Sequence, residues 1–160
     1  VYKRQEPEWV TICHCKICQR ATGAPFFVEP IFKKSNFNFW KGRPKVYRLV
    51  SEGNGKAIDV NFCTTCAIKL TLGFERLPDK IGIYAGTFAD PDWFDRSPDN
   101  SRVIFADYAQ HGSHIPAGYK VYREHAQTRD GSPIKPIIFG EHQVVGETLR
   151  LLLASDVAEN

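Results

Sequence analysis

The stretch Cys13-His14-Cys15-Lys16-Ile17-Cys18 places three cysteines close together, and the landmarks Gly23, Pro25 and Phe26 follow it. A second short stretch, Cys63-Thr64-Thr65-Cys66, contains the other two cysteines of the sequence. Thiolates at the two ends of a C-x-x-C turn converge on one point, and zinc takes sulfur ligands at about 2.3 Å in a tetrahedron. Because soft thiolates favour zinc over harder cations, the two clusters predict zinc binding.

The spacing of the cysteines permits two arrangements of the ligands. In the first, the two C-x-x-C pairs bind one zinc as a closed structural site, and Cys13 is spare. In the second, Cys13, Cys15 and Cys18 bind their own zinc and leave one tetrahedral position open, which is typical of catalytic zinc. Cys63 and Cys66 would then need ligands from the histidines or from residues upstream of Val1. The spacing alone slightly favours the closed site, because that site needs no further ligands.

Composition narrows the class of protein. The sequence has 160 residues, a formal net charge of +3 and 24% charged residues, which fits one ordinary globular domain without a basic surface for nucleic acid. No segment approaches the roughly 20 apolar residues that a membrane helix needs. An odd number of clustered cysteines favours metal in a reducing compartment over disulfides, so we expect a cytoplasmic protein. The aromatic residues are compatible with a homodimer.

Short apolar runs separated by Gly, Pro, Asn and Asp predict a mainly β protein, either a sandwich or an open barrel of mostly antiparallel strands. Helical signals are few: residues 15–22 before Gly23, a turn at 90–94 and a terminal helix at 147–155. The expected strands are residues 8–13, 24–32, 36–39, 45–50, 57–62, 69–74, 80–87 and 103–108.

Four landmarks along the chain carry a resemblance to a known family. They are Cys-His-Cys-x-x-Cys with the following Gly-x-Pro-Phe, Trp40-x-Gly42-x-Pro44-x-x-Tyr47, Phe62-Cys63-x-x-Cys66, and Ala85-Gly86-Thr87-Phe88-x-Asp90-Pro91. In this order and spacing they resemble the glutathione-dependent formaldehyde-activating enzymes, a family that includes the centromere protein V-like proteins. The resemblance covers about residues 8–125, so we expect a domain over residues 1–125 and a packed extension over 126–160.

The resemblance implies stacked antiparallel sheets with zinc knuckles and two zinc sites. Cys13, Cys15 and Cys18 would bind a zinc at the active site. Cys63 and Cys66 would bind a structural zinc with a C-x-C pair on an earlier hairpin, which we expect upstream of residue 1. The family usually carries glycine after the C-x-x-C, whereas this sequence has Ala67.

The resemblance also implies an activity, the condensation of formaldehyde with glutathione by a carbon–sulfur lyase running in reverse. Cys13, Cys15 and Cys18 would be the catalytic residues, because a zinc with an open position can activate a thiol. The alternative is a zinc-binding structural or interaction module without turnover.

Other side chains near the cysteines have weaker predicted roles. Lys16 and Arg20 are candidates for attracting a carboxylate, and Thr22, Gly23 and Phe26 for shaping a pocket wall. We expect His14, His111 and His114 to be solvated or supporting histidines rather than ligands, and Trp93 to be a core or interface residue.

Overall fold

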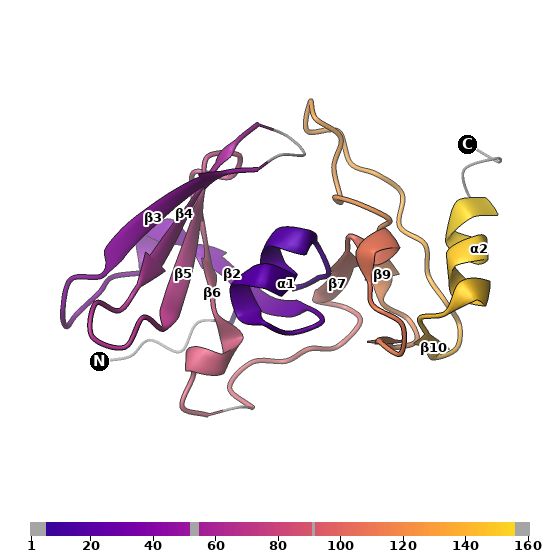
Figure 1. The fold of residues 1–160 in the computed structure, drawn as a ribbon, viewed down its shortest axis with the longest axis horizontal. Coiled ribbons are helices and arrows are strands. Elements are labelled where there is room, and N and C mark those ends of the chain that lie inside the picture. Colours follow the sequence, from indigo (N-terminus) through magenta and orange to yellow (C-terminus); the bar gives the residue numbers. More distant parts are fainter. Residues whose placement is uncertain (1–5, 52–54, 91, 156–160) are drawn as a thin grey trace. The chain divides into compact units, whose positions relative to one another are not determined.

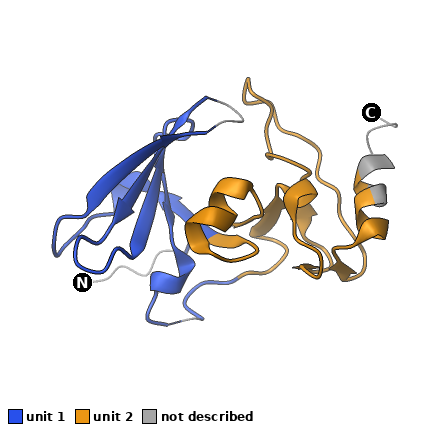
Figure 2. Cartoon of the chain, in the orientation of Figure 1, with its two compact units in different colours: residues 1–10, 29–95 blue, residues 11–28, 96–160 orange. Residues whose placement is uncertain are grey.

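The computed structural model describes residues 6–51, 55–90 and 92–155 (Figure 1). The chain forms two compact units, residues 1–10 with 29–95 (unit 1) and residues 11–28 with 96–160 (unit 2) (Figure 2). The chain crosses between the units inside strands β1 (Trp9–Cys13) and β2 (Phe27–Lys33), so each of these strands contributes to both. The division of the chain at residue 125 stays a prediction.

Unit 1 is built on a sheet with the strand order β3-β4-β5-β6-β2-β1, in which the pairings from β3 to β2 are antiparallel. Strands β3 to β6 lie side by side in Figure 1. Their bounds are Lys45–Val50, Ala57–Phe62, Lys69–Phe74 and Lys80–Ile83. Val60, Leu72 and Ile81 of these strands are buried. The same unit contains an aromatic group in which the Trp93 ring stacks on Phe88 at a centroid distance of 4.7 Å.

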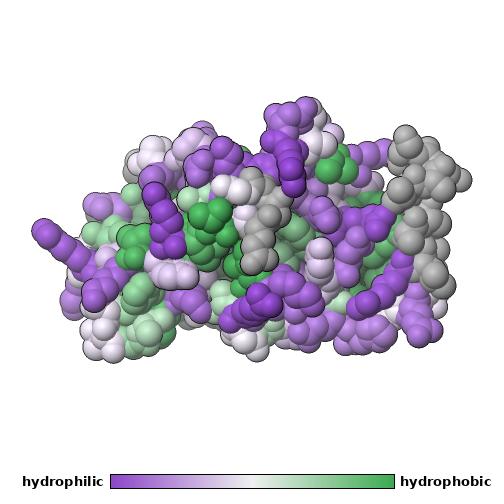
Figure 3. Space-filling view, turned by 45° about the horizontal axis from the view of Figure 1, so that its top comes forward, coloured by the Kyte–Doolittle hydropathy of each residue, from purple (hydrophilic) through white to green (hydrophobic). Residues whose placement is uncertain are grey.

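Strand β3 forms the outer edge of this sheet. Val46, Tyr47 and Val50 are each more than half exposed. Arg48 lies opposite Asp59 on β4, and two of its nitrogens donate to the two carboxylate oxygens at 2.7 Å each. The hydrogen bonds from Arg48 lower the pKa of Asp59. A charged pair of this kind is a common protection of a sheet edge against pairing with other chains, and the face drawn in Figure 3 shows polar side chains interspersed among the apolar ones.

Unit 2 combines the end of β1 with β7 (Ser101–Ile104) and β9 (Lys120–Val121), in the order β1-β7-β9. The β7–β9 pairing is parallel, so the sheet is mixed. A short second sheet pairs β8 (His114–Ile115) with β10 (Gln143–Val144). Helix α2 (Glu147–Ser155) contributes Leu149 and Leu153 to the core around Ile115 and Val121, because residues four apart lie on one helix face.

The predicted fold class is confirmed, because the described residues are mainly β with an open sheet that ends at β3 and β9 and does not close into a barrel. The terminal helix is confirmed at Glu147–Ser155. Helix α1 (Lys16–Thr22) begins one residue later than predicted and ends at Gly23, which has a φ of 69°. In the turn predicted at 90–94, Trp93 N donates to Asp90 O at 3.3 Å and Asp92 N donates to Asp90 Oδ1 at 3.0 Å, while residue 91 lies outside the described part of the chain.

The structure corrects several of the predicted strands, and the one predicted at 24–32 begins only at Phe27. Residues 36–39 form no strand, because a 3-10 turn, η1 (Lys34–Asn36), precedes two aromatic rings that pack edge to face on each other. The strand predicted at 80–87 ends at Ile83, before η2 (Ala85–Thr87). The strand predicted at 103–108 ends at Ile104, because Phe105 has a φ of 57° and begins η3 (Ala106–Tyr108). A left-handed residue cannot continue a β ladder.

Gly82 on β6 gives a test of the packing in unit 1. A Cβ at this position would contact Glu29 Oε1 and would lie 2.8 Å from Glu29 Cδ, and the Glu29 side chain is buried. We expect Gly82→Ala to lower the free energy of unfolding by about 1–3 kcal/mol, because a buried side chain must move to admit the methyl group. Urea denaturation measures the change. Gly86→Ala is the control, since nothing lies within 4 Å of its Cβ, and equal effects of the two substitutions would contradict the packing argument.

Candidate metal centre

Three thiols converge in unit 2 where β1 passes into α1. Cys13 is the last residue of β1, Cys15 caps the N-terminus of α1, and Cys18 lies in the first turn of that helix. Their sulfur atoms all lie within 4.8 Å of one another. Among the described residues, this is the one group of three or more Cys, His, Asp or Glu side chains close enough to hold a metal ion.

Local backbone geometry explains why the three sulfurs meet. The extended residues up to Cys13 end where His14 N donates to Ile104 O of β7 at 3.1 Å, which anchors the chain to the neighbouring strand. Cys15 has extended backbone angles, as an N-cap residue should, and its sulfur accepts a hydrogen bond from Cys18 N at 3.3 Å. The turn of helix that follows brings Cys18 back toward Cys15. The sulfur atoms of the C-x-C and C-x-x-C segments therefore point to the same place.

The ionisation of the three thiols is strongly coupled. Hydrogen bonds from Cys13 and Cys18 lower the pKa of Cys15 to about 3, with further help from backbone N–H groups at the start of α1. The pKa of Cys13 is raised by its hydrogen bond to Cys15, and the pKa of Cys18 is raised by its hydrogen bond to Cys13. Three negative charges this close repel one another, so a single thiolate with two neutral thiols is the state expected without a compensating cation.

These residues fit a zinc ion. In a tetrahedron with zinc–sulfur bonds of about 2.3 Å, neighbouring sulfur atoms are roughly 3.8 Å apart. The three sulfur atoms here lie within 4.8 Å of one another, so small side-chain rotations bring them to that separation. A divalent cation would also remove the repulsion that keeps two of the thiols protonated. Cys13 is buried, whereas Cys15 and Cys18 are partly exposed, so the group is reached from the protein surface.

The surroundings of the thiols are apolar. Cys13 is part of a buried cluster with Ile104 and Ala126, and Cys15, Cys18, Phe105 and Tyr122 pack against it. The Phe105 ring also contacts the His125 ring edge to face, with the centroids 6.3 Å apart. Its left-handed backbone, uncommon for a bulky residue, turns the chain from β7 into η3 beside the thiols.

The side-chain amide of Gln19 ties the cysteine loop to η3. Gln19 Nε2 donates to His14 O at 2.6 Å and to Tyr108 O at 2.9 Å. Its Oε1 accepts from Gln110 Nε2 at 3.0 Å, so both ends of the amide are hydrogen-bonded. Gln19 therefore positions the loop that carries the cysteines, although its own side chain carries no ligand atom of the group.

Cys63 and Cys66 form a separate turn in unit 1. Ala67 N donates to Cys63 O at 2.9 Å, and Cys63 N donates to Ile68 O at 2.9 Å. Backbone N–H groups of Cys66 and then Thr65 lower the pKa of Cys63, because they point at its sulfur. The turn thus stabilises a thiolate, as a zinc knuckle requires. Ala67 has a φ of 59°, the conformation for which glycine is the usual choice.

The other predicted site residues lie in various places. His14 is 1% exposed with its ring against Phe26, so it is buried rather than solvated, and it is not in the cysteine group. Lys16 is exposed with its Nζ 5.9 Å from the centre of the Tyr108 ring, and Arg20 is exposed. Thr22 donates to Cys18 O within the helix.

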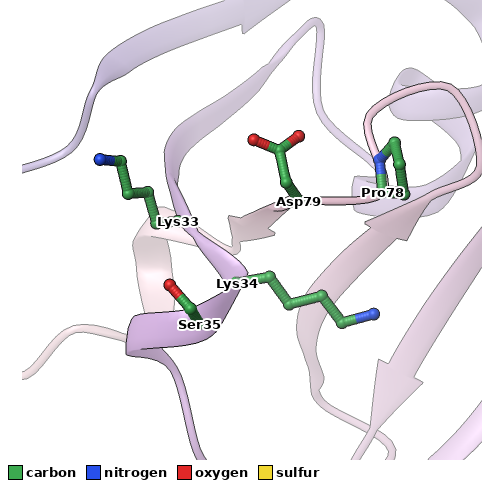
Figure 4. A pocket seen from close by; sticks show the side chains of 5 residues that line it. All are labelled: Lys33, Lys34, Ser35, Pro78 and Asp79. Atoms are coloured by element: carbon green, nitrogen blue, oxygen red, sulfur yellow. The ribbon is translucent and has the colours of Figure 1, made fainter.

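The remaining predicted residues are outside the cysteine group. His111 is exposed. His114 contacts His142, with Nδ1 and Nε2 2.8 Å apart. Trp93 packs in the aromatic group of unit 1. An open pocket of about 400 Å³ in unit 1 is lined by Lys33, Lys34, Ser35, Pro78 and Asp79 (Figure 4). Because these residues include no cysteine or histidine, the pocket is not part of the candidate metal centre.

Sequence patterns did not reveal that Phe105 and Tyr122 pack beside the thiols, or that Gln19 donates to Tyr108 O. Phe105, Tyr108 and Tyr122 lie far from the cysteines in the sequence, and the pairing of β1 with β7 brings their part of the chain to the cysteine loop. Gln19 directly follows a cysteine, but its role depends on carbonyl groups that the fold brings to it.

Fold and site together define a class of protein, a mainly β protein with a cluster of three cysteines able to hold a metal ion. The family model of the glutathione-dependent formaldehyde-activating enzyme matches residues 1–105, and the chain belongs to this family. The matched residues include both cysteine clusters.

No curated protein matches the chain. No helix among the described residues has the length and apolar character needed to span a membrane.

The Gln19 amide gives a test of loop positioning. We expect Gln19→Ala to lower the free energy of unfolding by about 1–2 kcal/mol, because two backbone carbonyls lose their donor. We also expect zinc to pass more rapidly from the zinc-loaded variant to a coloured chelator. Gln110→Ala is the matched control, since it removes only the outer hydrogen bond. Equal zinc-release rates in the two variants would contradict the positioning role.

A substitution at Ala67 is expected to stabilise the protein, whereas Gln19→Ala is expected to destabilise it. We expect Ala67→Gly to raise the free energy of unfolding by about 1 kcal/mol, because glycine adopts a positive φ without the steric cost that Ala67 bears. Ala57→Gly, in strand β4, is the control and should be destabilising, since its φ is not positive. Urea denaturation of both variants measures these changes in the free energy of unfolding. A destabilised Ala67→Gly would contradict the assigned turn geometry.

Proposed function

We propose that this protein is a zinc-dependent carbon–sulfur lyase that forms and cleaves the adduct of formaldehyde with glutathione. The observation that carries the proposal is the convergence of three cysteine sulfurs within 4.8 Å in a chain of the formaldehyde-activating family. Three protein ligands leave one position of a zinc tetrahedron for a substrate, which separates this group from closed structural sites. Cys13, Cys15 and Cys18 are the proposed zinc ligands and catalytic residues.

Zinc bound there would supply charge stabilisation for a thiolate and polarisation of a small carbonyl. The protein's own residues have three tasks. The cysteines hold the metal, Phe105 and Tyr122 keep the surroundings apolar and limit water, and Gln19 holds the cysteine loop on η3. Apolar surroundings strengthen electrostatic interactions at the site.

The proposed reaction joins two small substrates. The thiol of glutathione loses its proton, its sulfur bonds to the carbonyl carbon of formaldehyde, and the carbonyl π bond breaks. The carbonyl oxygen gains a proton, so that S-hydroxymethylglutathione is the product and the atoms balance. Lys16 and Arg20, exposed on the helix that carries Cys18, offer positive charge to the carboxylates of glutathione.

We assign Cys63 and Cys66 to a second, structural zinc. The turn geometry that stabilises the Cys63 thiolate supports this assignment. No third ligand group accompanies the pair among the described residues, so the remaining ligands are proposed to come from a C-x-C pair upstream of residue 1. A cytoplasmic location, where glutathione is abundant, is part of the same proposal.

The formation of the adduct can be measured directly by exchange NMR spectroscopy with formaldehyde and glutathione. We expect the zinc-loaded protein to accelerate the exchange. Cys13→Ser should reduce the acceleration by at least about 100-fold, because the ligand set of the proposed active site is broken. Treatment with a strong chelator should abolish the acceleration, and added zinc should restore it.

Cys66→Ser is the matched control, because it removes an exposed thiol from the other cluster. It should lower the zinc content by one per chain and keep most of the acceleration in protein that remains folded, as circular dichroism would report. Equal exchange rates with wild-type protein, Cys13→Ser and no protein would refute the proposed activity. Bound zinc without any acceleration would instead identify a non-catalytic zinc module.

A further inference from the structure

A pair of histidines lies in unit 2 beside the short sheet of β8 and β10: His114 is the first residue of β8, and His142 directly precedes β10. His114 Nδ1 and His142 Nε2 are 2.8 Å apart, and the ring centroids are 4.9 Å apart with the planes tilted by 44°. Both side chains are exposed. Neither residue belongs to the cysteine group, and the proposed lyase reaction makes no use of them.

The register of β8 and β10 brings the two histidines close together. Val144 pairs with His114 in the antiparallel ladder, and His142 precedes Val144 by two residues. His142 thus enters β10 in the diagonal position relative to His114, and the contact between their rings shows that the two side chains meet. Hydrogen bonds from Val145 N to Ser113 O and from Gly112 N to Val145 O, at 2.8 and 2.9 Å, fix the adjoining backbone.

We propose that His114 and His142 form a binding site for a divalent transition cation, such as Ni²⁺, Zn²⁺ or Cu²⁺. Imidazole nitrogen is a preferred ligand of these metals, with bonds of about 2.0–2.1 Å to zinc. Two such nitrogens on adjacent positions of one ion are roughly 2.9–3.4 Å apart. The observed nitrogen separation is therefore only slightly too short, and a small ring rotation opens it.

Binding replaces one hydrogen bond by two metal bonds. Without metal, one of the facing nitrogens carries the proton that the other accepts. With metal, His114 coordinates through Nδ1 and keeps its proton on Nε2, while His142 coordinates through Nε2 and keeps its proton on Nδ1. Each ring stays neutral, and water completes the coordination shell because both rings are exposed.

A metal ion at this site would hold together the two segments of unit 2 that contain β8 and β10. β8 and β10 each contain two residues, so their ladder has few hydrogen bonds of its own. The segment after β8 returns at His142 and leads into α2, whose Leu149 packs in the core with Ile115. An ion that joins His114 to His142 closes this segment and stabilises the packed state by mass action.

Titration calorimetry with nickel chloride tests the site in protein whose cysteine sites already carry zinc. We expect one saturable Ni²⁺ site per chain in wild-type protein. His114→Gln and His142→Gln should each weaken it by roughly 100-fold, because chelation by two linked ligands becomes binding by one. The melting temperature should rise with Ni²⁺ in wild-type protein and not in these two variants.

His111→Gln is the matched control, since His111 is an exposed histidine in the same part of the chain. It should bind Ni²⁺ as tightly as wild-type protein does. Circular dichroism of each variant checks that the fold is kept, which the exposure of both rings leads us to expect. The proposal would be overturned if wild-type protein showed no saturable Ni²⁺ binding, or if His114→Gln bound Ni²⁺ as tightly as wild-type protein. The contact between the two rings would then be only a hydrogen bond. Neither result bears on the cysteine site.

Discussion

The repulsion that would arise among three thiolate charges held within 4.8 Å is the constraint on which the cysteine-bearing unit depends. Each sulfur is placed by a different feature of the backbone: the end of a strand, an N-cap, and the first turn of a helix. The pKa values diverge because one thiolate is stabilised at the expense of the other two. A divalent cation is the natural counterpart of such a group, since it allows all three to ionise together.

The packing around the thiols shows how the fold supports that arrangement. The hydrogen bond from His14 to β7 and the two bonds from the Gln19 amide hold the cysteine loop against backbone segments from the second half of the chain. Phe105 turns sharply at the end of β7, and the turn places its ring beside the sulfurs. Ligand geometry thus depends on contacts distant in sequence, which is the usual condition for a preorganised site.

Much of the secondary structure was accessible from the sequence, because it rests on local signals. Gly23 ends α1 as predicted, and the terminal helix has the predicted bounds. The errors have different physical causes. At Phe105 a bulky residue takes a left-handed conformation that no propensity favours, and the predicted strand stops there. The run after Asn36 has alternating aromatic residues, but these pack on each other instead of joining a sheet.

The sequence by itself determined which side chains can bind metal, because C-x-C and C-x-x-C spacings focus sulfur atoms through local geometry. It also identified the family, whose model covers both cysteine clusters. The spacing alone left open whether Cys13 was spare, the family resemblance grouped it with Cys15 and Cys18, and the tertiary structure places the three sulfurs together. Tertiary structure alone also decided what surrounds the group and which histidines meet, because strand pairing joins residues such as His114 and His142 that no local pattern connects.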